Sequence, residues 1–291
     1  MDLAQLLHQI GTEDAARFLE KDPLRFPRGF RDPRDQEIAA FFSALLAYGR
    51  ADMIGRSLED LFSRMPEGPS AFVAKAEAKP ALERLSGFKH RFNDGRDLAA
   101  LALILRRLRE EAGSLESFFL RGDDGCLPHI GAALSRFCDA ALSVDLGALY
   151  GRARGASRGY LPYLFPSPER GSACKRLCML MRWLCRKDDG VDLGLWTKVD
   201  PSRLVIPLDT HTARISRLVG LSRRRTADWK MALEVTCALK RYDARDPVRY
   251  DFALAHLGIS DGCRGKAGPA CPGCALRGFC PVQGLSPIIE Q

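Results

Sequence analysis

The stretch DQEIAAFFSALLAY, residues 35–48, decides the fold. Its apolar residues recur at steps of three and four positions, which is the spacing of one face of an α-helix, and few polar residues interrupt them. The stretch follows the turn-forming residues 30–33, so the start of the helix is marked as well. It therefore predicts a helix that is buried on most sides.

The same helical spacing recurs along most of the chain, and convincing strands are close to absent. Further helices are expected at residues 53–65, 97–112, 115–120, 131–141, 174–186, 210–219, 229–240 and 247–258. Only residues 203–208 have a β-like composition, and Pro207 indicates an extended connector there instead of a paired strand. We therefore predict an all-α fold.

Length and composition restrict the class of protein. The chain has 291 residues, 46% of them hydrophobic, which excludes disorder and suits one large domain or two modest ones. Lys and Arg number 44 against 36 Asp and Glu, so the net charge of +8 favours a polyanionic partner such as nucleic acid.

The longest apolar run, residues 98–105, is far shorter than the roughly 20 residues that cross a bilayer. With no export signal at Met1, we expect a cytoplasmic protein without membrane contact, whose thiols stay reduced or bind metal.

Four of the ten cysteines lie close together near the C-terminus, in a segment rich in Gly and Pro: Cys263, Cys271, Cys274 and Cys280. Four thiolates at this density predict a metal centre, and both tetrahedral zinc and an iron–sulfur cluster suit four cysteine ligands. The uneven gaps of seven, two and five residues favour the cluster over a zinc ribbon. The loop after Cys263 carries Arg264 and Lys266, which could contact phosphate groups. The remaining cysteines are expected in the core: Cys126, Cys138, Cys174, Cys178, Cys185 and Cys237.

The segment Gly171, Ser172, Ala173, Cys174 and Lys175 opens one of the expected helices. Small residues let another backbone come close, and the free N–H groups of a first helical turn suit a phosphate of a nucleic acid strand. The helix dipole at that end disfavours the charged form of an amine, as nucleophilic catalysis requires. A solvated surface lysine is the alternative interpretation.

Asp209 stands directly after the apolar connector and just before the helix at 210–219. Such an acid is a natural N-cap, whose carboxylate accepts hydrogen bonds from the following turn. A half-buried carboxylate held charged in this way is also placed to face a developing cation. Both interpretations are open at this point.

The run LDTHTARI at residues 208–215, followed by the four-cysteine tail, resembles the helix-hairpin-helix superfamily of base-excision DNA glycosylases, the endonuclease III type. The Gly171–Lys175 turn is similar to the hairpin that delivers the catalytic lysine in those enzymes. Runs at residues 171–176 and 246–254 look closest to an uncharacterised bacterial branch of the superfamily.

The resemblance implies a fold, a site and a cofactor. The fold would have two helical lobes, residues 36–190 as a six-helix-barrel-like lobe ending in the lysine helix, and residues 1–35 with 191–291 around the cluster. Lys175 would be the nucleophile, Asp209 the catalytic carboxylate and the four tail cysteines the ligands of a 4Fe-4S cluster, with zinc as the other candidate. Gly171, Ser172 and Ala173, with Arg264 and Lys266, would contact DNA.

The implied function is removal of a damaged base from double-stranded DNA, with AP-lyase activity, by a monomer associated with the nucleoid. Lys175 and Asp209 are 34 positions apart, a separation that resembles the archaeal 8-oxoguanine glycosylases, so an oxidised purine is the expected substrate. Trp183 and Trp196 are candidates for the wall of a pocket that holds the flipped base, with core packing as their alternative fate. A non-catalytic iron–sulfur DNA-binding protein and a zinc-stabilised RNA-binding or RNA-modifying protein remain alternative functions.

Overall fold

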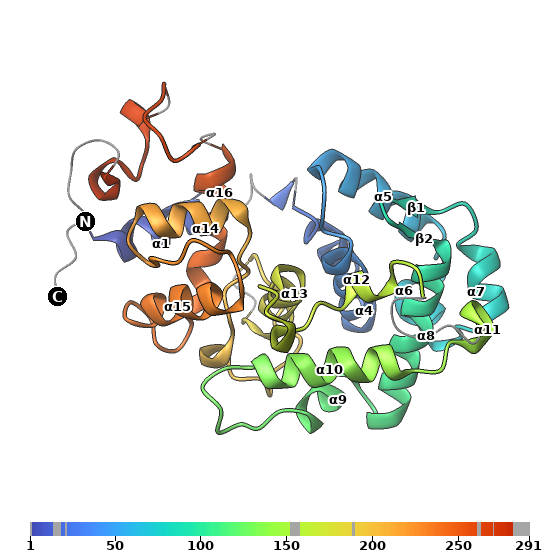
Figure 1. The fold of residues 1–291 in the computed structure, drawn as a ribbon. Helices are drawn as coiled ribbons and strands as arrows, with labels where there is room; N and C mark the ends of the chain where they lie inside the picture. Colours follow the sequence, from blue (N-terminus) through green and yellow to red (C-terminus); the bar gives the residue numbers. More distant parts are fainter. Residues whose placement is uncertain are drawn as a thin grey trace.

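The protein is almost entirely helical, and the all-α prediction is confirmed (Figure 1). The computed structural model describes residues 2–13, 19–20, 22–151, 158–187, 190–260, 263–269 and 271–281. The helices are α1 (Leu3–Glu13), α3 (Arg25–Arg28), α4 (Pro33–Leu45), α5 (Ala51–Ser63), α6 (Pro69–Ala74), α7 (Ala78–Arg84), α8 (Gly95–Ala112), α9 (Leu115–Arg121), α10 (Gly131–Ser143), α11 (Gly147–Tyr150), α12 (Leu161–Leu164), α13 (Lys175–Cys185), α14 (Thr210–Leu218), α15 (Trp229–Lys240) and α16 (Asp251–Ser260). Short 3-10 helices are η2 (Pro168–Arg170), η3 (Pro201–Arg203), η4 (Pro247–Tyr250), η5 (Cys271–Gly273) and η6 (Arg277–Phe279).

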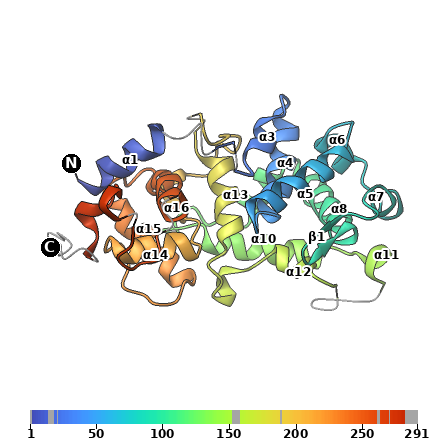
Figure 2. The same cartoon turned by 90° about the horizontal axis from the view of Figure 1, so that it is seen from above.

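Helix α13 lies in the middle of the molecule (Figures 1 and 2). On one side of it lie α14, α15 and α16 with the N-terminal α1, and on the other lie α4 to α12. Helix α1 packs on α16, so the two ends of the described chain meet in one group of helices. The division into lobes at residues 36–190 and 1–35 with 191–291 stays a prediction.

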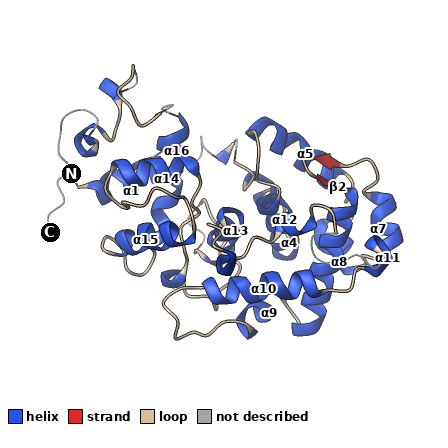
Figure 3. Ribbon diagram, in the orientation of Figure 1, coloured by secondary structure: helices blue, strands red, loops and turns tan. Residues whose placement is uncertain are grey.

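The strands of the described chain are one short hairpin (Figure 3). Strand β1 (Lys89–His90) pairs antiparallel with β2 (Asn93–Asp94), with Lys89 opposite Asp94 and His90 opposite Asn93. The hairpin leads directly into α8, whose start is fixed by a capping box between Asp94 and Asp97. Residues 204–209 are an extended connector, as their proline predicted.

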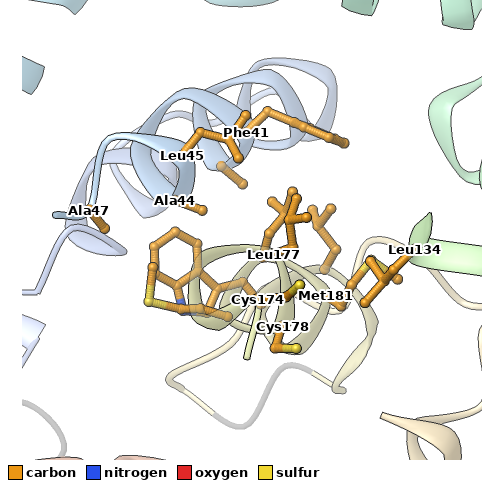
Figure 4. Close-up of a cluster of buried hydrophobic side chains, with 14 of the residues drawn as sticks. Phe41, Ala44, Leu45, Ala47, Leu134, Cys174, Leu177, Cys178 and Met181 are labelled. Atoms are coloured by element: carbon orange, nitrogen blue, oxygen red, sulfur yellow. The ribbon is translucent and has the colours of Figure 1, made fainter. Parts of the chain in front are cut away.

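Helix α4 corresponds to the helix predicted at 35–48, but it begins two residues earlier and ends at Leu45. Its N-cap is Asp32, whose side chain accepts a hydrogen bond from the Arg34 backbone N–H. All residues from 38 to 45 are buried, because α4 packs against α3, α6 and α13 together. Figure 4 shows Phe41, Ala44 and Leu45 of α4 facing Leu177 and Met181 of α13 across this contact. Burial of these apolar side chains thus holds α13 against α4 and fixes the position of Lys175 at the start of α13.

None of the helices in the described ranges is long and apolar enough to span a membrane. The expected core position of the other cysteines is right for Cys138, Cys174, Cys178 and Cys185, which are buried. It is wrong for Cys126 and Cys237, which are exposed. Cys126 lies in the loop before α10, and Cys237 lies on α15 outside the face that buries Ala232, Val235 and Leu239.

Candidate active site

Lys175 is the first residue of α13, and the turn before it has an uncommon backbone. Gly171 has a φ of 79° and Cys174 a φ of 49°, so the turn contains two left-handed residues, of which only the first is a glycine. The Ser172 hydroxyl accepts from the Cys174 N–H at 3.2 Å, and the Gly171 carbonyl accepts from the N–H of Trp229 in α15 at 3.2 Å. These contacts fix the turn from both sides and define where α13 begins.

Asp209 is the N-cap of α14. Its Oδ1 accepts from the backbone N–H groups of His211 and Thr212, both at 2.8 Å. The local sequence favoured this capping role, and it is confirmed. Oδ1 of Asp209 therefore caps α14, and Oδ2 takes no part in the cap.

The second oxygen of Asp209 contacts Lys175. Lys175 Nζ lies 3.4 Å from Asp209 Oδ2, and the two side chains are 37% and 22% exposed. This contact brings together the two residues that the resemblance assigned to one catalytic site, although 34 positions of chain separate them. Both groups are therefore partly accessible to solvent.

The charge state of Asp209 follows from its surroundings. Burial raises the pKa of the carboxyl, but the Lys175 ammonium and the N–H groups of Thr212 and His211 outweigh it and leave the pKa below its ordinary value. Asp209 is therefore ionised at neutral pH. A fixed negative charge beside an amine can stabilise a cation that forms between them.

A buried network of ion pairs holds α13 against the helices that follow it. Arg182 pairs with Asp192 at 3.1 Å and with Asp251, the first residue of α16. One turn on, Arg186 pairs with Asp192 and with Asp246, the latter at 2.9 Å. Asp246 and Asp251 lie 60 and 69 positions from the arginines they pair with, and the network was not predicted from the sequence.

Asp251 of this network lies within range of the charges of Lys175 and Asp209. Burial raises its pKa to about 6 against the opposing effect of Arg182, and the charges of Asp209 and Lys175 also act on it. The run Asp246–Leu254, which carries part of the resemblance, was the available sequence signal for Asp251. Because α13 and α16 are joined in this way and α16 packs on α14, the separation between Lys175 and Asp209 is set by buried contacts.

The four tail cysteines are half-buried on the surface next to this group of helices. The backbone N–H of Gly265 donates to Cys263 Sγ at 3.4 Å, and that of Gly268 donates to Cys271 Sγ at 3.3 Å. No three His, Cys, Asp or Glu side chains in the described ranges come close enough together to hold a metal ion. The metal centre at Cys263, Cys271, Cys274 and Cys280 therefore stays a prediction.

The remaining predicted site residues divide into exposed and buried ones. Gly171, Arg264 and Lys266 are exposed, and Ser172 and Ala173 are half-exposed, so all five are accessible. Trp183 and Trp196 are not, because they are 0% and 2% exposed in the hydrophobic core.

The burial of the two tryptophans has clear causes. Trp183 lies on α13, whose sides are covered by neighbouring helices. Trp196 donates from Nε1 to Glu37 at 2.7 Å and packs on Phe41 and Phe119. The structure therefore places neither ring where a flipped base could stack, contrary to the expected base pocket.

Comparison with known proteins places the chain in a family but supplies no activity. Residues 22–260 match the family described as "Protein of unknown function (DUF2400)", and the chain belongs to this family. No curated protein and no solved structure shows significant similarity to it. The expected membership in the helix-hairpin-helix glycosylase superfamily is wrong, because the matching family is a different one. The short runs at 171–176 and 208–215 were too local to assign a family.

Proposed function

We propose that the protein is a DNA glycosylase with AP-lyase activity, in which Lys175 forms a covalent intermediate with the sugar of a damaged nucleotide. The contact between Lys175 Nζ and Asp209 Oδ2 carries the proposal. It joins an amine and an ionised carboxylate at the starts of two helices, where both are accessible.

Cleavage of the bond between a base and its sugar leaves positive charge on the sugar and negative charge on the base. Asp209 is ionised, held by two backbone N–H groups, and therefore positioned to stabilise that positive charge. Lys175 lies beside it and supplies the nucleophile.

The bond from C1′ to the base nitrogen breaks, and its electron pair leaves with the base. The Lys175 ammonium gives a proton to the departing base, and the lone pair that this frees forms a bond from Nζ to C1′. The sugar ring then opens, with O4′ taking a second proton from Nζ, and a Schiff base results.

Strand cleavage follows from the Schiff base. A proton leaves C2′ to water and the C3′–O3′ bond breaks, which cuts the DNA strand. Water then hydrolyses the imine and returns the lysine. The Schiff base carbon accepts hydride from borohydride, so the intermediate can be trapped as a stable amine.

Other features support a nucleic acid substrate. The net charge of +8 favours a polyanion, and the accessible Gly171–Ala173 turn, with Arg264 and Lys266, offers contacts for phosphates. The proposal includes the two-lobed arrangement, with residues 36–190 in one lobe, and a monomer associated with the nucleoid. As the damaged base we propose an oxidised purine such as 8-oxoguanine in double-stranded DNA, a choice based on the long lysine-to-aspartate separation alone.

We further propose that the four tail cysteines hold a 4Fe-4S cluster, with zinc as the second candidate. Backbone N–H groups directed at Cys263 Sγ and Cys271 Sγ suit thiolates, because such hydrogen bonds stabilise the negative sulfur of a ligand. Bound there, the group would supply folding energy to the tail and hold the loop with Arg264 and Lys266 in place.

A second function is supported by the capping role of Asp209. A carboxylate already bonded to the N–H groups of α14 has a structural duty, and Lys175 could then be a phosphate contact. The protein would be a non-catalytic iron–sulfur DNA-binding protein.

The decisive experiment compares Lys175→Gln with the parent protein on a panel of damaged duplexes under borohydride. We expect the variant to lose covalent trapping while its affinity for DNA is nearly unchanged, since only one of many phosphate charges is removed. Lys79→Gln, on the exposed surface of α7, is the matched control and should trap like the parent. Trapping by Lys175→Gln at the parent rate would refute the assignment of the nucleophile. Absence of trapping and of base release by the parent on every duplex would favour the non-catalytic alternative.

A further inference from the structure

Three aromatic side chains outside the candidate active site form one exposed cluster. Phe92 is 42% exposed, Tyr160 53% and Tyr163 43%, and we call these three the aromatic platform. The Phe92 and Tyr160 rings are stacked with centroids 5.2 Å apart, and the Tyr163 ring lies edge-on to Phe92 at 5.9 Å. Large apolar rings exposed together mark an interaction surface.

The platform is built from distant segments. Phe92 is at the tip of the β1–β2 hairpin, while Tyr160 and Tyr163 lie just before and within α12. Tyr48, in the loop after α4, packs against Phe92 with parallel rings at 6.3 Å and against Tyr163 at 5.0 Å. The rings of Phe92 and Tyr163 thus rest on a fourth, half-buried ring, and Tyr160 stacks on Phe92.

Buried hydrogen bonds hold these segments in place beneath the rings. The Tyr48 hydroxyl donates to Asn93 Oδ1 at 2.6 Å, and Asn93 Nδ2 donates to Asp97 Oδ2 at 2.8 Å and to the Tyr160 carbonyl at 3.1 Å. The Tyr150 hydroxyl donates to the other oxygen of Asp97 at 2.7 Å. Because the rings are fixed before a partner arrives, binding costs little side-chain entropy.

Positive charge surrounds the platform. Lys89 and Arg91 are exposed on the hairpin, and the Arg91 guanidinium lies 5.5 Å from the centre of the Phe92 ring. Arg176 lies behind it, with its guanidinium 4.4 Å from the Tyr163 ring centre and a hydrogen bond to the Tyr163 carbonyl. Arg176 is the residue after Lys175, so the platform adjoins the start of α13.

We propose that the aromatic platform binds unpaired DNA bases by stacking, with the phosphates of the same strand on Lys89 and Arg91. Exposed rings with cations beside them can bind a strand whose bases are unstacked. Each base can stack on a ring, and each negatively charged phosphate can pair with a cation. The inference rests on the proposed function for the identity of the partner. It adds that the strand next to the extruded nucleotide is held open on this surface.

The test measures affinity for two short oligonucleotides, a single strand with bases and one of equal length made of abasic units, by fluorescence anisotropy. We expect the parent to bind the strand with bases more tightly. Phe92→Leu and Tyr160→Leu, which keep apolar bulk but remove a ring, should each weaken that binding about fivefold or more and leave the affinity for the abasic strand unchanged. Tyr160→Phe, which keeps the ring, should bind like the parent.

Tyr242→Leu is the matched control, because Tyr242 is 40% exposed but packs on Tyr250 away from the platform. Equal affinity of the parent for both oligonucleotides would overturn the proposal, as would parent-like binding by both leucine variants or capture of the platform by anionic lipid vesicles instead of DNA. Borohydride trapping at saturating DNA separates this result from the proposed function. The platform variants should still trap, whereas Lys175→Gln should bind the single strand but not trap.

Discussion

The two oxygens of Asp209 have separate duties, and two substitutions separate them. Asp209→Asn keeps an oxygen that can cap α14, since Asn and Asp are equally good N-caps, but removes the charge that faces Lys175. Asp209→Ala removes both. The two variants should therefore differ in stability, while both lose activity.

The magnitudes follow from the geometry. Loss of an N-cap costs about 1 kcal/mol of unfolding free energy. At the 3.4 Å separation of the Lys175 pair, Coulomb's law gives about 1 kcal/mol in water and about 5 kcal/mol at an effective dielectric constant of about 20. Because both side chains are partly exposed, the lower value applies. We expect Asp209→Asn to cost about 1 kcal/mol and Asp209→Ala about 2 kcal/mol, measured by urea unfolding.

The pH dependence has a definite sign. The pKa of Asp209 is lowered in the folded protein, so its contribution to stability is present at neutral pH and is lost as the pH falls below about 4, towards the folded-state pKa. The parent should therefore lose more stability on acidification than Asp209→Asn, which has no carboxyl to protonate there.

The activity assay decides between capping and catalysis. Single-turnover base release should slow by roughly 10²- to 10³-fold in Asp209→Asn, the effect of removing one well-placed electrostatic group. Base release at the parent rate in this variant would refute the catalytic role. Equal stability of the Asn and Ala variants would refute the separate capping contribution.

Two further predictions concern the tail and the buried network. Cys271→Ser should lose iron and sulfide and loosen the C-terminal segment, because the ligands supply the folding energy of that segment. Cys126→Ser, at an exposed cysteine outside the tail, should keep iron and sulfide. Full iron retention in Cys271→Ser would contradict the ligand assignment. Arg182→Met should lower the unfolding free energy by about 3 kcal/mol or more, because it leaves Asp192 and Asp251 buried without that cation. Arg34→Met, which removes one partner of an exposed pair, should cost much less. Equal losses in the two arginine variants, measured in urea, would show that the network does not stabilise the fold.

Most of the long helices could be predicted from sequence, because their apolar spacing reports directly on a buried face. Residues 35–48, 97–112 and 229–240 were expected as helices and correspond to α4, α8 and α15. The β1–β2 hairpin was not expected. Its residues, KHRFND at 89–94, have no alternating apolar pattern, and contacts from Tyr48 and Asp97 hold it instead.

The candidate site was predictable only in part. Each of Lys175 and Asp209 stands at a helix start that local sequence signals. Their contact depends on how α13 and α14 are placed, which involves the pairing of Arg182 with Asp251 across 69 positions of chain. No local pattern encodes such a contact, and the proximity was expected only from a family resemblance that proved wrong. The aromatic platform was missed for the same reason, because its rings come from segments about 70 positions apart.

The pairing of Arg182 with Asp251 also imposes an order on events at the ribosome. The guanidinium of Arg182 is made 69 residues before the carboxylate of Asp251, which is roughly 3 to 14 s at a synthesis rate of about 5–20 residues per second. During that interval the central helix cannot bury Arg182 without losing the water around an incompletely paired charge. The apolar face of α13, which packs on α4 in the folded protein, therefore stays exposed in the nascent chain during this interval. A chaperone can bind that face in this time.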